Sequence, residues 1–211
     1  PGINPNRVAR RPGLKEAAVR FLNDVDLKGK RVLIRVDFNV PLDEQQNITD
    51  DNRIRAALPT INYVLDEGGK VIVASHMGRP KGKPDEAFSL LPVARRLRRL
   101  LKCEVHMAPD CVGPEVEKQV AELKAGEVLV LENLRFHPGE TKNDPELCKQ
   151  LAALADVYIN DAFGTAHRAH ASTEGVCHHL DQCASGYLMA AEIVWFDRVL
   201  NKPERPLVAI L

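Results

Sequence analysis

Short apolar runs rich in β-branched residues alternate, from Arg31 onward, with longer segments whose apolar residues recur at helical spacing. Such alternation is typical of β-α-β units, in which a helix connects two parallel strands. The runs are apolar at consecutive positions, so both faces of these strands should be buried. The sequence therefore predicts an α/β fold with a doubly wound parallel sheet flanked by helices. The first expected strand begins at Arg31, and the others span Val71–Ala74, Val105–Ala108, Val128–Leu131 and Val157–Ile159.

The predicted helices lie between these strands. The first begins near Asp50 or Asp51, either of which can cap it, and it stops at Gly68 and Gly69. Pro59 falls inside its apolar stripe and predicts either a kink or a later start of the helix. The helix expected over residues 89–102 carries a basic run, for which a solvated face is favoured over a partner or anion surface. Further helices are expected within Gly113–Leu123, Asp144–Ala155 and Ser185–Asn201.

Composition excludes several classes of protein. Lysine plus arginine equal aspartate plus glutamate at 29 each, which argues against a general nucleic-acid or membrane-surface binder. No apolar run approaches the roughly 20 residues of a membrane span, and a secretory signal is not expected. The five cysteines contain no C-x-x-C pair, so the sequence indicates neither a disulfide framework nor a redox dithiol. A cytoplasmic location is therefore expected.

Three segments are expected along the 211 residues. Residues 1–20 show no periodicity and are interpreted as a flexible or foreign arm without assigned function. Residues 21–202 hold the predicted α/β domain. Pro203 and Pro206 precede an expected apolar strand, Leu207–Leu211, so residues 203–211 are interpreted as the start of a second, truncated domain.

Polar side chains follow four of the predicted strands where each strand ends. Asp37 and Asn39 follow the first strand, and His76 and Arg79 follow the second. Arg135 follows the strand at residues 128–131, while Asn160, Asp161 and Arg168 follow the strand at residues 157–159. In open parallel sheets, ligands bind in the crevice beyond the carboxyl ends of the strands. These residues are therefore candidate ligand contacts.

The chemistry of these groups indicates an anionic ligand. Arginine forks match the oxygens of phosphate and carboxylate groups, so several arginines at one edge suit a small, multiply charged acid. Asp37 repels such an anion unless it accepts a hydrogen bond from a hydroxyl group of the ligand. We expect a ligand with a phosphate, a carboxyl group and a hydroxyl, although each side chain taken alone would be interpreted as a surface charge or turn residue. The candidate residues are Asp37, Asn39, Arg53, His76, Arg79, Arg135 and Arg168.

Three other features carry less weight. Asn160 and Asp161 either contact the ligand or cap the turn that follows them. The segment Gly78–Pro84 is not expected to be a phosphate loop, because its glycine spacing is one residue short and Pro84 replaces the magnesium-binding Ser or Thr. No metal is expected, since the spacing of a histidine and cysteine cluster does not match structural zinc sites. That cluster comprises His167, His170, Cys177, His178, His179 and Cys183.

Five strings of the sequence together closely resemble the amino-terminal domain of the phosphoglycerate kinase family, from about Phe21 to Leu211. The strings are RVDFNVP at Arg35–Pro41, DDNRIRAALPTI at Asp50–Ile61, SHMGRPKG at Ser75–Gly82, LENLRFHPGE at Leu131–Glu140 and INDAFGTAHRAHAS at Ile159–Ser172. The resemblance implies the Rossmann-like, substrate-binding half of a two-domain glycolytic kinase. That enzyme transfers a phosphoryl group reversibly between 1,3-bisphosphoglycerate and ADP, giving 3-phosphoglycerate and ATP.

The resemblance also implies a role for each candidate. Asp37 and Asn39 would contact the hydroxyl region of the substrate, and Arg53, the catalytic residue, its carboxyl end. The remote phosphate would be held by His76, Arg79, Arg135 and Arg168. Magnesium with ATP or ADP would be bound by the carboxyl-terminal domain and not by this chain, which is expected to be a monomer and inactive alone. Cys177 and Cys183 depart from the family pattern, which usually has small apolar residues there.

Two other functional classes fit the same residues. A non-catalytic α/β module that binds a small phosphorylated acid needs the same anion site, and a nucleotide domain after Leu211 would distinguish the kinase from it. A zinc-dependent interaction module built on the histidine and cysteine cluster would be revealed by metal analysis.

Overall fold

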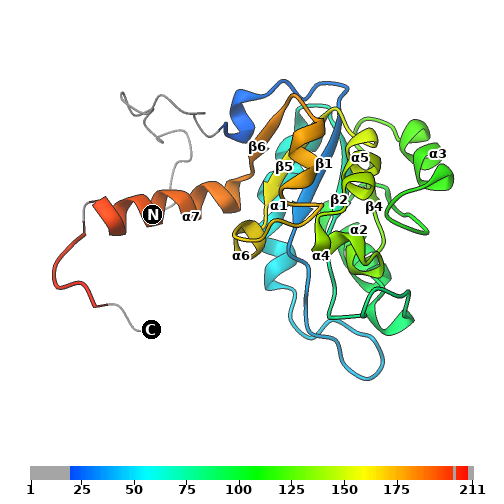
Figure 1. Ribbon diagram of the computed structural model, residues 1–211, viewed down its shortest axis with the longest axis horizontal. Coiled ribbons are helices and arrows are strands. Elements are labelled where there is room, and N and C mark those ends of the chain that lie inside the picture. Colours follow the sequence, from blue (N-terminus) through cyan, green and yellow to red (C-terminus); the bar gives the residue numbers. More distant parts are fainter. Residues whose placement is uncertain (1–19, 202, 209–211) are drawn as a thin grey trace.

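The computed structural model describes residues 20–201 and 203–208. In this part of the chain, six parallel strands form one sheet in the order β3-β4-β2-β1-β5-β6 (Figure 1). The strands are β1 (Arg31–Val36), β2 (Lys70–Ala74), β3 (Val105–Met107), β4 (Val128–Val130), β5 (Val157–Asp161) and β6 (Cys183–Ser185). The predicted doubly wound parallel sheet is confirmed. Strand β6 was not predicted, because its three residues, Cys-Ala-Ser, include no β-branched residue that signals a strand.

Helices flank the sheet on both faces (Figure 1). They are α1 (Asn52–Asp66), α2 (Leu91–Leu101), α3 (Pro114–Glu122), α4 (Gly139–Lys142), α5 (Pro145–Ala153), α6 (Phe163–Ala166) and α7 (Tyr187–Asn201). Short 3-10 turns are η2 (Leu22–Asp24), η3 (Glu86–Phe88), η4 (Leu134–Phe136) and η5 (Gly175–His179).

Side chains of the central strands alternate between two apolar cores, as the period of a strand requires. Val32, Ile34 and Val36 of β1 are buried in the core that includes α1 and α2. Leu33, which points to the opposite face, is buried in the core that includes α3 and α5. By the same alternation Arg35 shares the face of Leu33, yet it carries a charge. Its burial requires polar partners, which lie at the carboxyl end of the sheet.

The helix predictions differ from the structure mainly at their boundaries. Helix α1 begins at Asn52 and remains helical through Pro59, so the alternative of a start after the proline is wrong. The side chain of Asp51, at the position before α1, makes no capping hydrogen bond to the helix. Asp144 caps α5, because its side chain accepts hydrogen bonds from the amides of Glu146 (3.1 Å) and Leu147 (3.0 Å). The basic run of α2 faces outward. Within it, Arg98 is exposed and pairs with Glu104 at 3.0 Å, which supports the solvated-face interpretation.

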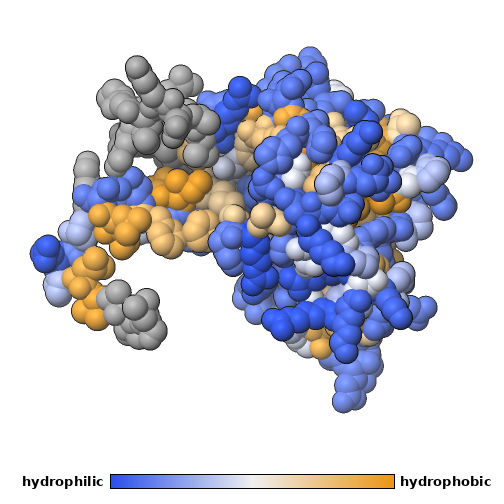
Figure 2. Space-filling view, viewed as in Figure 1, coloured by the Kyte–Doolittle hydropathy of each residue, from blue (hydrophilic) through white to orange (hydrophobic). Residues whose placement is uncertain are grey.

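Helix α7 extends away from the layered body of the domain (Figure 1). Its first turns bury Met189 and Ala190, whereas Trp195, Phe196 and Leu200 are exposed and form an apolar stretch (Figure 2). Beyond it, Leu207 and Val208 are not in a strand, which contradicts the start of the predicted strand; residues 209–211 lie outside the described residues. Residues 1–19 of the predicted arm also lie outside them. The three-segment division stays a prediction. Every helix in the described part is too short or too polar to cross a membrane.

Candidate anion-binding site

The predicted site residues lie at the centre of the sheet, where its winding changes direction. From β1 the chain proceeds to β2 on one side, while β5 pairs with β1 on the other side. Arg35 of β1 is in register with both Ala74 of β2 and Asn160 of β5, so these three strands end at the same level. The segments that follow them therefore share one edge, which is where open α/β sheets bind ligands.

Three of the predicted arginines line one pocket of about 420 Å³. They are Arg79 after β2, Arg135 in η4 and Arg168 after α6. Lys81 and Lys142 line the same pocket and were missed by sequence reasoning. Lys81 lies in the segment Gly78–Pro84, which was dismissed as a phosphate loop because its spacing is wrong for a nucleotide. The pocket is strongly cationic and is large enough for a small acid.

Asp37, Asn39, Arg53 and His76 lie apart from the lining of this pocket. Arg53 forms an ion pair with Asp37, with 2.7 Å between Nη1 and Oδ2, and its side chain is 54% exposed. This exposure leaves the Arg53 guanidinium accessible to a ligand. The sequence therefore identified two groups of residues at one edge, and only the arginines at 79, 135 and 168 share the pocket.

Gly78 connects the two groups. Its amide donates to Oδ1 of Asn39 at 2.8 Å, and its carbonyl oxygen accepts from Nη1 of Arg135 at 2.7 Å. Its φ is +57°, and a Cβ at this position would lie 2.3 Å from the ring of Phe88. Only glycine satisfies both the left-handed backbone and the close approach. Asn39 thus has a structural role that its position after a strand did not reveal.

Asn133 holds the segments after β2 and β4 together from inside the protein. It is fully buried, and its Nδ2 donates to the carbonyl oxygens of Met77 (2.7 Å) and Phe88 (2.9 Å). Its Oδ1 accepts from the amides of Met77 (3.1 Å) and Arg135 (3.0 Å). One side chain therefore fixes the backbone that carries Arg135 relative to the backbone that follows His76. Sequence reasoning did not select it as a site residue.

His76 is a neutral hydrogen-bonding group and not a cation. It is 6% exposed, and its Nδ1 lies 3.2 Å from Nη2 of Arg35. Because a guanidinium group only donates, Nδ1 must accept, and the ring proton is on Nε2. Burial, followed by the charges of Arg35, Arg135, Arg53 and Arg168, lowers the pKa of His76 from 6.5 to about 3. At neutral pH His76 can therefore offer an anion a hydrogen bond but no charge.

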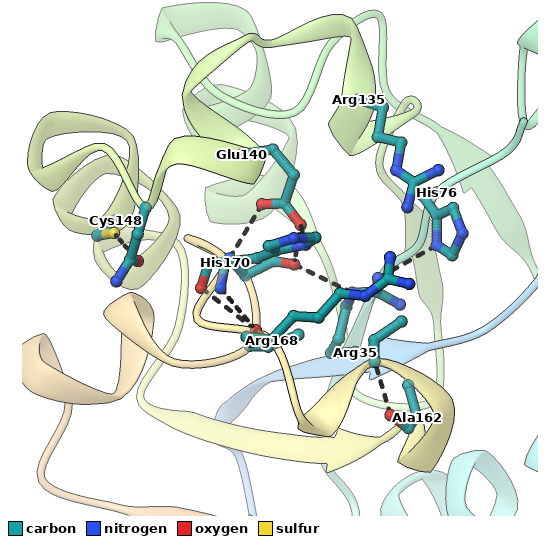
Figure 3. Close-up of polar contacts among 12 residues, drawn as sticks. Arg35, His76, Arg135, Glu140, Cys148, Ala162, Arg168 and His170 are labelled. Carbon is teal, nitrogen blue, oxygen red and sulfur yellow. Dashed lines mark hydrogen bonds and ion pairs between the residues drawn. The ribbon is translucent and has the colours of Figure 1, made fainter. Parts of the chain in front are cut away.

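A chain of buried polar side chains includes Arg35 and Glu140 (Figure 3). The guanidinium of Arg35, 1% exposed, donates from Nε to Oγ of Ser172 at 3.0 Å. Ser172 donates its hydroxyl to Oε1 of Glu140 at 2.6 Å and its amide to Oε2 at 3.0 Å. Glu140 is itself 1% exposed, and its Oε1 lies 3.8 Å from Nδ1 of His170. The chain links a buried cation to a buried carboxylate through one hydroxyl group, and it fixes the segment that follows Arg168.

The electrostatics of the pocket favour an anion. Burial and then the nearby positive charge of Arg168 lower the pKa of Arg135 below its ordinary value, although the group stays charged. The arginines therefore repel one another across a partly desolvated space. A bound phosphate would relieve this repulsion and would accept charge-assisted hydrogen bonds.

Asn160 and Asp161 both act as caps in the structure. The side chain of Asn160 accepts from the amide of Ala162 at 3.0 Å. Asp161 accepts from the amides of Leu188 (2.9 Å) and Met189 (3.2 Å) at the start of α7. Asn160 therefore caps the turn that follows it, which is one of the two alternatives left open, whereas Asp161 caps α7 and not the following turn.

The histidine and cysteine cluster does not gather at one point. Among the described residues, the group whose donor atoms lie within 4.8 Å of one another is Asp110, Cys111 and His137. These side chains already have partners: His137 contacts Asp110 at 2.6 Å, and the thiol of Cys111 donates to the carbonyl oxygen of Glu132 at 2.9 Å. The geometry gives no support to the zinc module.

The fold and the site define a doubly wound α/β domain with an arginine-lined anion pocket at the carboxyl edge of its sheet. The family model described as "Phosphoglycerate kinase" matches residues 22–211. The chain is 63% identical over 190 residues to a phosphoglycerate kinase of Moorella thermoacetica, and 58% identical over 192 residues to one of Chlorobium limicola. These alignments cover 90% and 91% of this chain but 48% of each relative. The chain belongs to the phosphoglycerate kinase family.

Solved structures of phosphoglycerate kinases also match this chain. The structure of phosphoglycerate kinase from Coxiella burnetii superposes with a TM-score of 0.80 at 37% identity, covering 92% of this chain and 48% of that one. The enzyme from Pyrococcus horikoshii superposes with a TM-score of 0.78 at 35% identity. The chain thus spans about half the length of the relatives it matches, and the resemblance stated from the sequence motifs is confirmed at the level of the family.

Proposed function

We propose that this chain is the substrate-binding half of a phosphoglycerate kinase and binds 3-phosphoglycerate or 1,3-bisphosphoglycerate. The observation that carries the proposal is the convergence of Arg79, Arg135 and Arg168 on one pocket of about 420 Å³. A phosphate group in this pocket would meet three guanidinium forks, and family membership supports this choice among small phosphorylated acids.

The remaining residues take complementary roles in this proposal. Neutral His76 donates from Nε2 to the anchored substrate. Arg53, exposed beside Asp37, approaches the carboxyl end where the phosphoryl group is transferred and stabilises the charge that develops there. Asp37 accepts from the substrate hydroxyl, and Asn39 contributes its Nδ2, since its Oδ1 already holds Gly78. Positioning and charge neutralisation are the main contributions a protein makes to phosphoryl transfer.

Magnesium and ATP or ADP belong, in this proposal, to a separate carboxyl-terminal domain. The chain alone should therefore bind phosphoglycerate but should not turn it over, because the donor and acceptor oxygens are not held in line. Proximity and orientation account for about 7 to 11 kcal/mol of such a barrier. The monomeric state and the cytoplasmic location stay predictions.

Calorimetric titration of the chain with 3-phosphoglycerate tests the binding proposal. We expect a dissociation constant on the order of 0.01 to 1 mM that weakens as salt increases. Arg168→Gln should weaken binding at least about tenfold, since one charge-assisted contact contributes roughly 1.5 to 3 kcal/mol. Arg99→Gln, on the exposed face of α2, is the matched control and should leave binding unchanged. Absence of saturable binding at low salt would overturn the proposal.

A coupled assay separates the kinase from the non-catalytic alternative. The purified chain is assayed with magnesium, ATP and 3-phosphoglycerate, alone and with the separately expressed nucleotide domain of a relative. Turnover by the chain alone, abolished in Arg53→Ala, would show that the nucleotide site has been assigned to the wrong half. Saturable binding without turnover in either assay would favour the module that only binds a phosphorylated acid.

A further inference from the structure

Cys177 and Cys183 bring their thiols together although five residues separate them in the sequence. Cys177 lies in η5 and Cys183 begins the edge strand β6. Sγ of Cys183 lies 3.9 Å from the carbonyl oxygen of Cys177, and the two thiols are close enough to change the pKa of each other. The chain turns back over residues 178–182, so that Cys183 lies beside Cys177. The spacing between the two cysteines is longer than in a C-x-x-C motif, so that motif does not identify this pair.

Both cysteines are free and partly exposed. Contact with Cys177, helped by the charges of Arg20 and His178, lowers the pKa of Cys183, although burial acts in the opposite direction. The same contact, together with burial, raises the pKa of Cys177. The pair therefore resembles a nucleophilic thiol with its proton-donating neighbour, and reactivity of cysteine follows thiolate character and access.

The other cysteines lack this arrangement. All five lie within the described residues, and burial raises the pKa of Cys103, Cys111 and Cys148. Cys111 is also fully buried and donates its thiol to a carbonyl oxygen. Cys183 is thus the cysteine of this chain whose pKa is lowered, and Cys177 is the thiol in contact with it.

We propose that Cys177 and Cys183 form a redox-active dithiol that a hydroperoxide oxidises to a disulfide. The sulfur of Cys183 attacks one peroxide oxygen, so an S–O bond forms, the O–O bond breaks and water or an alcohol leaves. The sulfur of Cys177 then attacks Cys183, forming the S–S bond, and the sulfenic oxygen departs as water with the proton of Cys177. Two thiols lose two electrons to the peroxide, which is reduced.

The bond would tie η5, which packs on α5, to the edge strand of the sheet. Cys183 is in register with Tyr158 of β5, so the closed ring would anchor the edge strand beside an interior one. The loop-closure entropy of this short ring implies an upward shift in Tm of roughly 5 to 9 °C on oxidation.

Thiol counting and peptide mass mapping of the whole chain test the proposal. A small excess of hydrogen peroxide should remove two of the five thiols and yield a peptide that joins Cys177 to Cys183 with the loss of two hydrogens. Dithiothreitol should reverse the change. In Cys177→Ser, Cys183 should stop at a sulfenic acid that dimedone traps, and Cys183→Ser should form no disulfide. Cys103→Ser, the control, should behave as the parent chain.

Two results would overturn the proposal. One is oxidation of Cys103, Cys111 or Cys148 before the pair. The other is a wild-type map in which both thiols stay reduced while circular dichroism shows a folded chain. Because the wild-type map requires no variant, misfolding of a serine variant would not obscure either result.

Discussion

Replacing Glu140 by glutamine should destabilise the domain by about 2 to 4 kcal/mol. The carboxylate accepts both the amide and the hydroxyl of Ser172, and hydrogen bonds to a charged group contribute roughly 1.5 to 3 kcal/mol each. A glutamine side chain has the same shape as glutamate and one carbonyl oxygen, but its NH₂ group would face a hydrogen-bond donor of Ser172. It also removes the negative charge that faces the buried guanidinium of Arg35 through Ser172.

Urea unfolding followed by circular dichroism measures this loss. Glu122→Gln is the control, since Glu122 is exposed and lies 4.0 Å from Lys118; a surface pair of this kind should change stability by less than about 0.5 kcal/mol. Loss of stability in Glu140→Gln no larger than in the control would refute the reasoning.

A double-mutant cycle identifies the source of the effect. Arg35→Met removes the buried cation and keeps an apolar stem of similar length. If the charges of Arg35 and Glu140 act together through Ser172, the double variant should lose at least about 1 kcal/mol less than the sum of the single losses. Strict additivity would show that Glu140 acts through Ser172 alone.

Two further predictions concern His76 and Gly175. The pKa of His76 is about 3 in the folded chain, below its unfolded value, so its stabilisation is complete above about pH 6.5 and is lost as pH decreases toward 3. Between pH 7 and pH 5 this loss of stability is about 2 kcal/mol. In His76→Asn, whose Oδ1 can replace Nδ1 as the acceptor, urea unfolding at different pH values should no longer show this loss. An unchanged dependence of stability on pH in the variant would contradict the assignment of His76 as neutral. Gly175→Ala places a Cβ 2.2 Å from both Sγ of Cys148 and Oδ1 of Asn143, and should lower stability by about 1 to 3 kcal/mol. Gly164→Ala, with open space around the new methyl group, should not lower it, and equal effects in the two thermal melts would refute the packing argument.

The sequence alone determined the sheet and the edge that carries the site. Apolar β-branched runs are local signals, so the strands of β1, β2, β4 and β5 were predicted from their own residues. The polar groups that follow them were then placed at one edge, because parallel strands end together. The motifs also identified the family. The residues of β6 did not predict a strand, because its strand conformation depends on pairing with β5 and not on its own residues.

Only the tertiary structure decided which polar groups act together and in what state of charge. Arg35 lies inside an apolar strand and Glu140 more than 100 residues later, and folding alone reveals that Ser172 joins them. The charge of His76 likewise depends on burial and on arginines from other strand ends, none of which its neighbours in the sequence specify. Burial and long-range hydrogen bonds are properties of three-dimensional proximity, which local propensity does not encode.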